Sequence, residues 1–188
     1  MAATDAELIK AFNDGDVSAL DELISRYKAP LYAYLLRLTR DRDAADDIFQ
    51  EVFVKVIKKL GAYGEKDKFS AWLFTVGHHA VMDHFRARTR RREDSLYAAD
   101  GENRAPEETL ASREPSPEAS LLCAARADAV EAAFDKLSPE QREVFLLRHY
   151  SGLSFREIAE TLNVPIGTAL ARMSRALARM RDELEEGL

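Results

Sequence analysis

The sequence predicts an all-α protein with two small helical domains joined by a flexible acidic linker, the second domain containing a helix-turn-helix. Apolar residues recur every three to four positions, which is the spacing of a buried helix face, and no sustained apolar-polar alternation predicts a strand. Residues 93–116 are rich in Pro, Glu, Asp and Ala and poor in bulky apolar side chains, as is typical of a linker. The expected domains are therefore residues 1–92 and 117–188.

Composition sets the broad class. The 188 residues are 46% hydrophobic and 32% charged, which is a globular composition. A single cysteine, Cys123, excludes a disulfide framework or a cysteine-based metal cage within the chain and favours a reducing compartment. The N-terminal residues lack an apolar signal core, and no run approaches the roughly 20 apolar residues of a membrane span. We therefore expect a cytoplasmic protein with no direct membrane insertion.

Helix signals divide the first domain. Thr4 opens a capping box and Gly15 ends the first helix. Ser18 with Asp21 offers a second cap, and Pro30 is then expected to open a further helix.

Next comes a strongly periodic helix over residues 44–60, acidic at its start and basic at its end, as the helix dipole favours. Residues 61–68 are expected to form a loop, and Phe69 to begin a long helix that runs into an arginine cluster. The buried stripe of the periodic helix is predicted to contain Ile48, Val52, Val56 and Leu60, beside Phe49, Phe53 and Ile57.

The long helix carries a polar stripe that ends in arginines, which suits reading bases in a melted strand while holding its backbone. A third row, of Phe74, Val81 and Phe85, is more typical of packing against a neighbouring helix. The polar stripe contains Thr75, His79, Met82 and Arg86, with Asp83 and Arg90 slightly offset.

A metal centre or a catalytic site is not expected. His79 and Asp83 are spaced to share a metal, but adjacent histidines point roughly 100° apart on a helix, so the histidine cluster does not converge. No nucleophile elbow, glycine-rich phosphate loop or paired-carboxylate pattern occurs. The sequence therefore predicts no metal, no cofactor and no enzymatic activity.

In the second domain, a helix through Ala133 and Phe134 precedes a second start signal. Ser138, Pro139 and Gln141 give a cap, a first-turn proline and a capping-box partner. The next capping box, Ser154 with Glu157, opens the first helix of a helix-turn-helix. Asn163 suits the left-handed residue after that helix, and Pro165 with Gly167 leads into the second helix.

The second helix of this unit has a cationic face. An arginine stripe alone is usually a solvated surface, but the preceding capped helix and short turn match a DNA-docking unit. Arginine both pairs with phosphates and reads guanine in the major groove. The cationic face contains Thr168, Arg172, Arg175 and Arg179, and the packing face is expected to contain Ala169, Met173, Ala176, Leu177 and Met180.

The net charge of −6 does not oppose DNA binding, because it is located in one stretch. Residues 93–119 carry eight acidic and two basic side chains, a sum of −6, so the rest of the chain is neutral. Two basic clusters, at 86–92 and 172–181, stand against that neutral background, and such local patches set the field that DNA feels.

With these motifs described, the chain resembles the bacterial extracytoplasmic-function group of sigma factors, over nearly everything except the linker. The segment LYAYLLRLTRDRDAADDIFQEVFVKV and the later FSAWLFTVGHHAVMDHFRARTRR are similar to the second conserved region of that family. The segment LSPEQREVFLLRHYSGLSFREIAETLNVPIGTALARMSRALARMR is similar to its fourth.

This resemblance implies a dissociable subunit that joins RNA polymerase core, recognises two promoter elements and is held inactive by an anti-sigma factor. It implies that the clamp coiled coil of the beta-prime subunit binds Asp47, Gln50, Glu51 and Phe53. The melted −10 element is implied to contact Tyr63, Lys66, Lys68, His79, Asp83, Arg86 and Arg90. The −35 duplex is implied to contact Thr168, Leu170, Ala171, Arg172, Ser174, Arg175 and Arg179.

Two departures from the family bear on base choice. Family members commonly have Asn where this chain has His79, and histidine has a different hydrogen-bonding geometry from an amide. They commonly have a basic or polar pair where it has Leu170 and Ala171, which offer only apolar contact, as to a thymine methyl, or face the core.

Two other functions are compatible with parts of the pattern. A sigma-mimicking adaptor would bind an anti-sigma factor without touching DNA, but it would have little use for the basic clusters. A conventional dimeric repressor would use the helix-turn-helix but would not need the core-docking pattern of the first domain.

Overall fold

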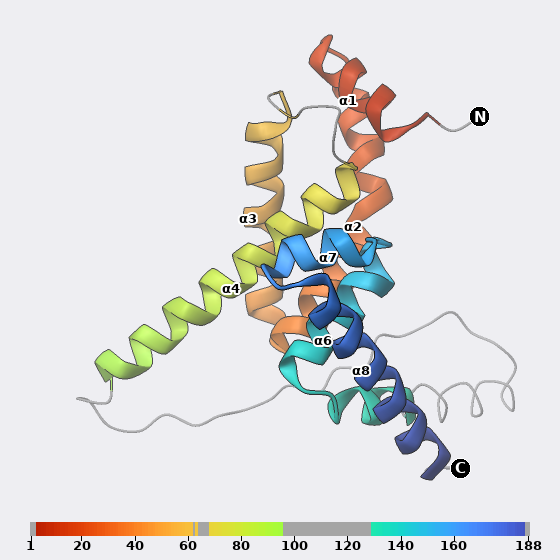
Figure 1. The fold of residues 1–188 in the computed structure, drawn as a ribbon. Helices are drawn as coiled ribbons and strands as arrows, with labels where there is room; N and C mark the ends of the chain where they lie inside the picture. The colour runs from red at the N-terminus through yellow and green to blue at the C-terminus, as the bar shows by residue number, and fades with distance from the viewer. Residues whose placement is uncertain (1–2, 62, 64–67, 96–128, 187–188) are drawn as a thin grey trace, which may run out of the picture.

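The computed structural model describes residues 3–61, 63, 68–95 and 129–186, apart from the side chains of 92–95 and 186. All regular elements in these ranges are helical (Figure 1). The predicted linker lies outside the described residues from position 96 onward, and residues 93–95 belong to a helix. The elements are α1 (Asp5–Asn13), α2 (Val17–Thr39), α3 (Arg42–Leu60), α4 (Phe69–Ser95), helical residues 129–135, α6 (Pro139–Leu146), the π-helical turn η1 (Leu147–Ser151), α7 (Phe155–Leu162) and α8 (Ile166–Glu186).

The start of α1 is the capping box predicted from sequence. The Thr4 amide donates to the Glu7 carboxylate at 2.7 Å, and the Glu7 amide donates to the Thr4 hydroxyl at 3.3 Å. The predicted cap at Ser18 is wrong, because Asp16 caps α2 and accepts from the Ser18 amide at 3.0 Å. The Asp16 carboxylate, two residues before Ser18, accepts from this amide as in an Asx turn. The Ser18 hydroxyl also donates to Asp16 and therefore does not act as the cap.

Helix α2 does not begin at Pro30, so that prediction is also wrong. The helix runs unbroken from Val17 to Thr39 with the proline inside it. A proline removes one backbone hydrogen bond and crowds the preceding turn. Apolar residues on both sides of it, Leu23 before and Leu31 and Leu35 after, are buried in one core, and this shared burial carries the helix across the proline.

The first core is built where α3 and α4 pack against α2. The predicted stripe Ile48, Val52, Val56 and Leu60 is buried, as are Phe74 and Val81 of the row expected to pack. Helix α4 approaches α2 closely at Gly77, where an added Cβ would lie 3.2 Å from Leu31 Cδ1. Glycine therefore permits the close crossing of the two helices.

The second core is formed by α6, η1, α7 and α8. Helix α6 starts at the predicted Ser138 capping box, but its end is a π-helical turn that periodicity did not reveal. The packing face of α8 is mostly as predicted, with Ala169, Ala176 and Met180 buried. For Leu177 the prediction is wrong, because this side chain is 46% exposed.

The two helical units pack against each other, with α2 touching α6 and η1, and α4 touching η1 and α7. Arg37 of α2 pairs with Glu131 at 2.5 Å, and Arg40 at the end of α2 pairs with Asp135. The ring of Phe134 lies between two guanidinium groups, 5.9 Å from Arg37 and 5.6 Å from Arg142. The buried residues of both units form one continuous apolar cluster.

A buried polar pair lies at the centre of the first core. The hydroxyl of Tyr34, which is fully buried, lies 3.1 Å from His78 Nδ1. Burial and the nearby His79 and Arg86 lower the pKa of His78 from 6.5 to about 4. Neutral His78 is therefore the form that the fold accommodates.

We expect stability to depend on pH through His78. The unfolded chain takes up this proton near pH 6.5 and the folded chain only near pH 4, so stability is highest above pH 6.5 and falls as pH is lowered toward 4. The loss between pH 7.5 and pH 5 should be about 2 kcal/mol in urea denaturation. His78→Gln should flatten this dependence, whereas His79→Ala, at an exposed neighbour, should keep most of it, because burial is the largest cause of the lowered pKa. An equal slope in both variants would contradict the assignment.

Candidate nucleic-acid interface

The helix-turn-helix is held by local hydrogen bonds that the sequence predicted. The Ser154 amide donates to Glu157 at 2.6 Å, and the Glu157 amide donates to the Ser154 hydroxyl at 3.3 Å. Asn163 ends α7 in the left-handed region at φ 52°. The Thr168 amide donates to the Pro165 carbonyl at 2.9 Å, which closes the first turn of α8. The turn is therefore fixed by its own residues.

The cationic stripe of α8 is only partly free. Arg175 and Arg179 are exposed, with Arg179 3.7 Å from the Glu183 carboxylate, whereas Thr168 and Arg172 are half-buried. Arg172 lies near α6. The pKa of Glu140 is lowered mainly by its own hydrogen bonds, and the charge of Arg172 adds to this. Burial raises the pKa of Glu143, and the charge of Arg172 opposes that rise. Arg175 and Arg179 are thus the side chains of this stripe most available to DNA.

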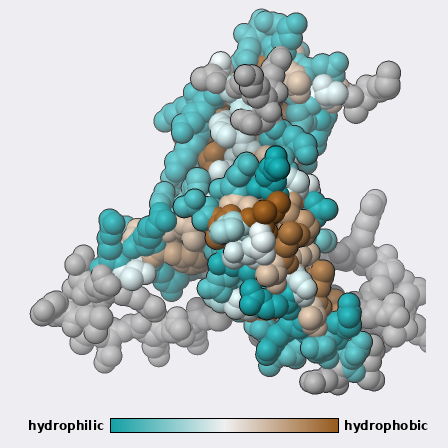
Figure 2. All heavy atoms as spheres, viewed as in Figure 1, coloured by the Kyte–Doolittle hydropathy of each residue, from teal (hydrophilic) through white to brown (hydrophobic). Residues whose placement is uncertain are grey.

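The other residues expected at the −35 element lie around the helix from this stripe. Ala171 and Ser174 are exposed, and so is Leu170 at 46%. Leu170 does not face the core, but at 100° per residue it stands about 140° from Arg175. It joins Ile166 and Leu177 in an exposed apolar stripe that sequence reasoning missed, and hydrophobic residues cluster over the start of α8 in Figure 2.

The polar stripe of α4 is exposed along its second half. His79, Asp83, Arg86 and Arg90 all face outward, with an Asp83–Arg86 ion pair at 2.8 Å. Thr75, one turn before His79, is covered instead: its hydroxyl lies 2.9 Å from that of Thr161 on α7.

The loop ahead of α4 is described only at its ends, and the predicted residue Lys66 lies outside the described residues. Lys68 pairs with Glu157 of α7 at 3.5 Å. Tyr63 is half-buried among aromatic rings, with centroids 4.9 Å from Trp72 and 6.0 Å from Phe69. The aromatic cluster of Tyr63, Phe69 and Trp72 thus forms the base of the loop, and α7 lies beside it.

One face of α3 brings the predicted docking residues together. Asp47, Gln50 and Glu51 are exposed, and Phe53 is half-buried at the margin against Phe49. The next turn of the helix adds two apolar side chains that sequence reasoning did not assign to this face, Val54 at 50% and Ile57 at 43% exposure. The signal for Val54 was available, because it follows Gln50 and Glu51 by four and three residues and so shares their face.

Comparisons with known proteins assign both helical units to one family. The sequence matches Sigma-70 region 2 over residues 23–91 and Sigma-70 region 4 over residues 127–180. The RNA polymerase sigma-H factor of Pseudomonas aeruginosa is 31% identical over 173 residues, covering 92% of this chain and 89% of that protein. The ECF RNA polymerase sigma factor EcfG of Rhodopseudomonas palustris is 31% identical over 80% of this chain and 76% of that protein. The chain belongs to the extracytoplasmic-function sigma factors.

Solved structures support the fold. The sigma factor RpoE of Bartonella quintana, in complex with the anti-sigma factor NepR, aligns with a TM-score of 0.68 at 24% identity, over 90% of this sigma factor and 98% of that chain. The structure of CnrH in complex with the cytosolic domain of CnrY aligns with a TM-score of 0.64 at 23% identity, over 97% of each.

Membership of this family gives the general function of the protein as a subunit of RNA polymerase. This sigma factor associates with RNA polymerase core and gives it promoter specificity in transcription initiation. The region 2 match covers most of α2, all of α3 and most of α4, and the region 4 match contains the helix-turn-helix. Helix α1 precedes both matches.

Two absences hold for the described residues. These residues contain no group of three or more His, Cys, Asp and Glu side chains placed to bind a metal ion. Across the same ranges of this sigma factor, no helix combines the length and apolar character that a membrane span requires.

Proposed function

We propose that three surfaces of this sigma factor divide its work. The exposed half of the α4 stripe and the loop before it bind the melted −10 element, the α8 helix binds the −35 duplex, and the exposed face of α3 binds the clamp coiled coil of the polymerase beta-prime subunit. The observation that carries the proposal is the exposure of His79 and Arg86 on one helix and of Arg175 and Arg179 on another.

The α3 face has the composition of a docking surface. Val54 and Ile57 supply exposed apolar area, and Gln50 and Glu51 surround it with polar groups. An apolar centre within a polar rim is the usual anatomy of a protein–protein interface. Glu51 is also paired with Lys55 at 2.6 Å, so part of its charge is already satisfied within the helix.

The proposal extends to the location, domain bounds and partner of the protein. We propose that it acts in the cytoplasm, carries no catalytic residue of its own, and consists of residues 1–92 and 117–188 with a linker between them. By analogy with the sigma factor that was solved with an anti-sigma factor, we propose a partner of that class. The alternative, an adaptor that only sequesters such a partner, would not direct transcription.

The compact arrangement is incompatible with engaging both promoter elements at once. The two elements are centred about 25 base pairs apart, or roughly 85 Å along the DNA. Thr75 touches Thr161, and Thr161 lies seven residues from Thr168, a span of at most about 25 Å. His79 is one turn from Thr75, about 6 Å. The two DNA surfaces therefore lie a few tens of ångströms apart, and the chain must open.

We expect a disulfide across the closed interface to block transcription. Thr75→Cys with Thr161→Cys, in a Cys123→Ser background, places two thiols where hydroxyls lie 2.9 Å apart. The oxidised double variant should lose at least about tenfold of run-off transcription with core polymerase, because the DNA surfaces cannot separate. Reductant should restore transcription, and the transcription directed by each single variant should not change when oxidant is added. Full activity of the crosslinked protein would contradict the required opening.

Arg175 provides the test of the −35 surface. Arg175→Ala should lower run-off transcription from a −35-dependent promoter about tenfold, since one lost base or phosphate contact costs about 1–3 kcal/mol. Affinity for core polymerase should not change. Arg181→Ala is the matched control, because Arg181 is exposed but lies about 120° around the helix. An equal loss of transcription in both variants would show that the cationic stripe of α8 does not bind the −35 duplex. Tight core binding with no transcript from wild-type protein on any promoter would favour the adaptor.

Val54 provides the test of the docking surface. Val54→Asp should raise the Kd for core polymerase at least about tenfold, because it places an unpaired charge at the centre of the contact. The fold should be unchanged, since Val54 is already exposed. Lys59→Ala, on an exposed position about 140° away on the same helix, should bind core normally. Wild-type affinity of the Val54 variant would exclude this face.

A further inference from the structure

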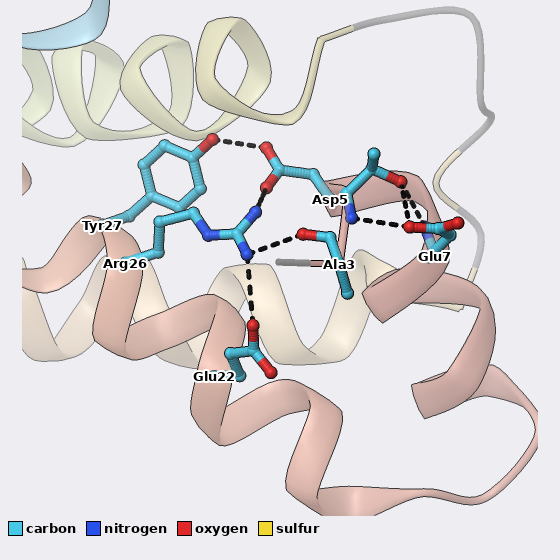
Figure 3. A network of polar contacts seen from close by, with 7 residues as sticks. Ala3, Asp5, Glu7, Glu22, Arg26 and Tyr27 are labelled. Carbon is cyan, nitrogen blue, oxygen red and sulfur yellow. Dashed lines mark hydrogen bonds and ion pairs between the residues drawn. The ribbon is translucent and has the colours of Figure 1, made fainter. Parts of the chain in front are cut away.

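A polar network joins α1 to the second helix, and Figure 3 shows it. The Asp5 carboxylate lies between two consecutive residues of α2: one oxygen accepts from Arg26 at 2.5 Å, and the other accepts from the Tyr27 hydroxyl. Arg26 also donates to the Ala3 carbonyl at 2.8 Å and pairs with Glu22 at 3.2 Å. The Thr4 capping box fixes the start of α1 and so presents Asp5 toward α2.

The docking of α1 does not rest on this network alone. Leu8 and Ile9 of α1 are buried in the core and anchor the helix by apolar contact. The Asp5–Tyr27 hydrogen bond therefore fixes something more local than the position of α1. What it fixes is the ring of Tyr27, which is half-buried. The pKa of this tyrosine is raised, first by burial and second by the hydrogen bond to Asp5.

The Tyr27 ring leads to the base of the −10 loop. Its edge meets Phe69, the buried first residue of α4, at a centroid distance of 5.4 Å. Phe69 in turn lies 5.8 Å from Trp72 and 6.0 Å from Tyr63. Tyr27 is thus the contact through which the α1 network reaches the aromatic cluster of Tyr63, Phe69 and Trp72.

We propose that Tyr27, held by Asp5, is a positioning residue for −10 recognition. It fixes Phe69 and, through the aromatic cluster, sets the start of α4 relative to the loop end at Tyr63. Neither residue contacts DNA in this role. This inference rests on the proposed function of the loop and of α4, and it gives a part to α1, which lies outside both matched regions.

The test uses full-length protein assembled with core polymerase. Tyr27→Phe keeps the ring and removes only the hydroxyl, and Asp5→Ala removes the carboxylate that accepts from this hydroxyl. Holoenzyme affinity is measured for a fork-junction DNA with a single-stranded −10 segment, for the same DNA with the −10 bases scrambled, and for a duplex carrying the −35 element alone. Glu22→Gln is the matched control, because it breaks the exposed Arg26 pair in the same network and leaves Tyr27 untouched.

We expect both variants to lose roughly three- to tenfold in the preference for the correct over the scrambled −10 segment, the range of one hydrogen bond. The combined variant should lose no more than either one, since both remove the same bond. Affinity for core and for the −35 duplex should match that of Glu22→Gln and wild type. An equal loss on all three measurements, or none on the −10 preference, would overturn the inference.

The failure of the proposed function would look different. Wild-type holoenzyme would then fail to distinguish the correct from the scrambled −10 segment. If wild type discriminates and both variants discriminate equally well, the positioning role alone is wrong.

Discussion

The burial of the Tyr34 hydroxyl is the constraint on which the arrangement of helices depends. Tyr34 lies on α2, the helix that α1, α3, α4, η1 and α6 all contact. A buried hydroxyl without a partner would cost roughly 1–3 kcal/mol. His78 of α4 supplies that partner at 3.1 Å, one residue after the close crossing at Gly77. The rotation and height of α4 on α2 are thereby fixed, and with them the direction of the polar stripe that begins at Thr75.

Much of the fold was predictable because its signals are local. The capping boxes at Thr4, Ser138 and Ser154 and the left-handed Asn163 depend on residues within one turn, and the structure confirms them. Pro30 was misjudged because burial on both sides of a proline is a tertiary effect. The exposure of Leu177 and the π-turn after Leu146 were missed for the same reason, since neither is decided by neighbours along the chain.

In the candidate surfaces, too, local patterns were predictable from sequence and tertiary contacts were not. Periodicity placed His79, Asp83 and Arg86 on one exposed stripe, and they do share it. It did not reveal that Thr75 lies under α7, because that contact joins residues 86 positions apart. The separate functions proposed for α4 and α8 were inferred from resemblance, and the structure adds the packing that couples them.

The contact between the two helical units combines a shared apolar core with ion pairs that are partly exposed at its edge. Arg37–Glu131 and Arg40–Asp135 stand at its edge, and the buried Nε atoms of Arg37 and Arg142 lack a hydrogen-bond partner among the described residues. Ion pairs of this kind contribute about 0–1 kcal/mol each and are screened over a Debye length of about 8 Å at physiological ionic strength. Added salt is therefore expected to weaken the ionic edge of this contact and to leave its apolar part in place, so that ionic strength adjusts how readily the two units separate.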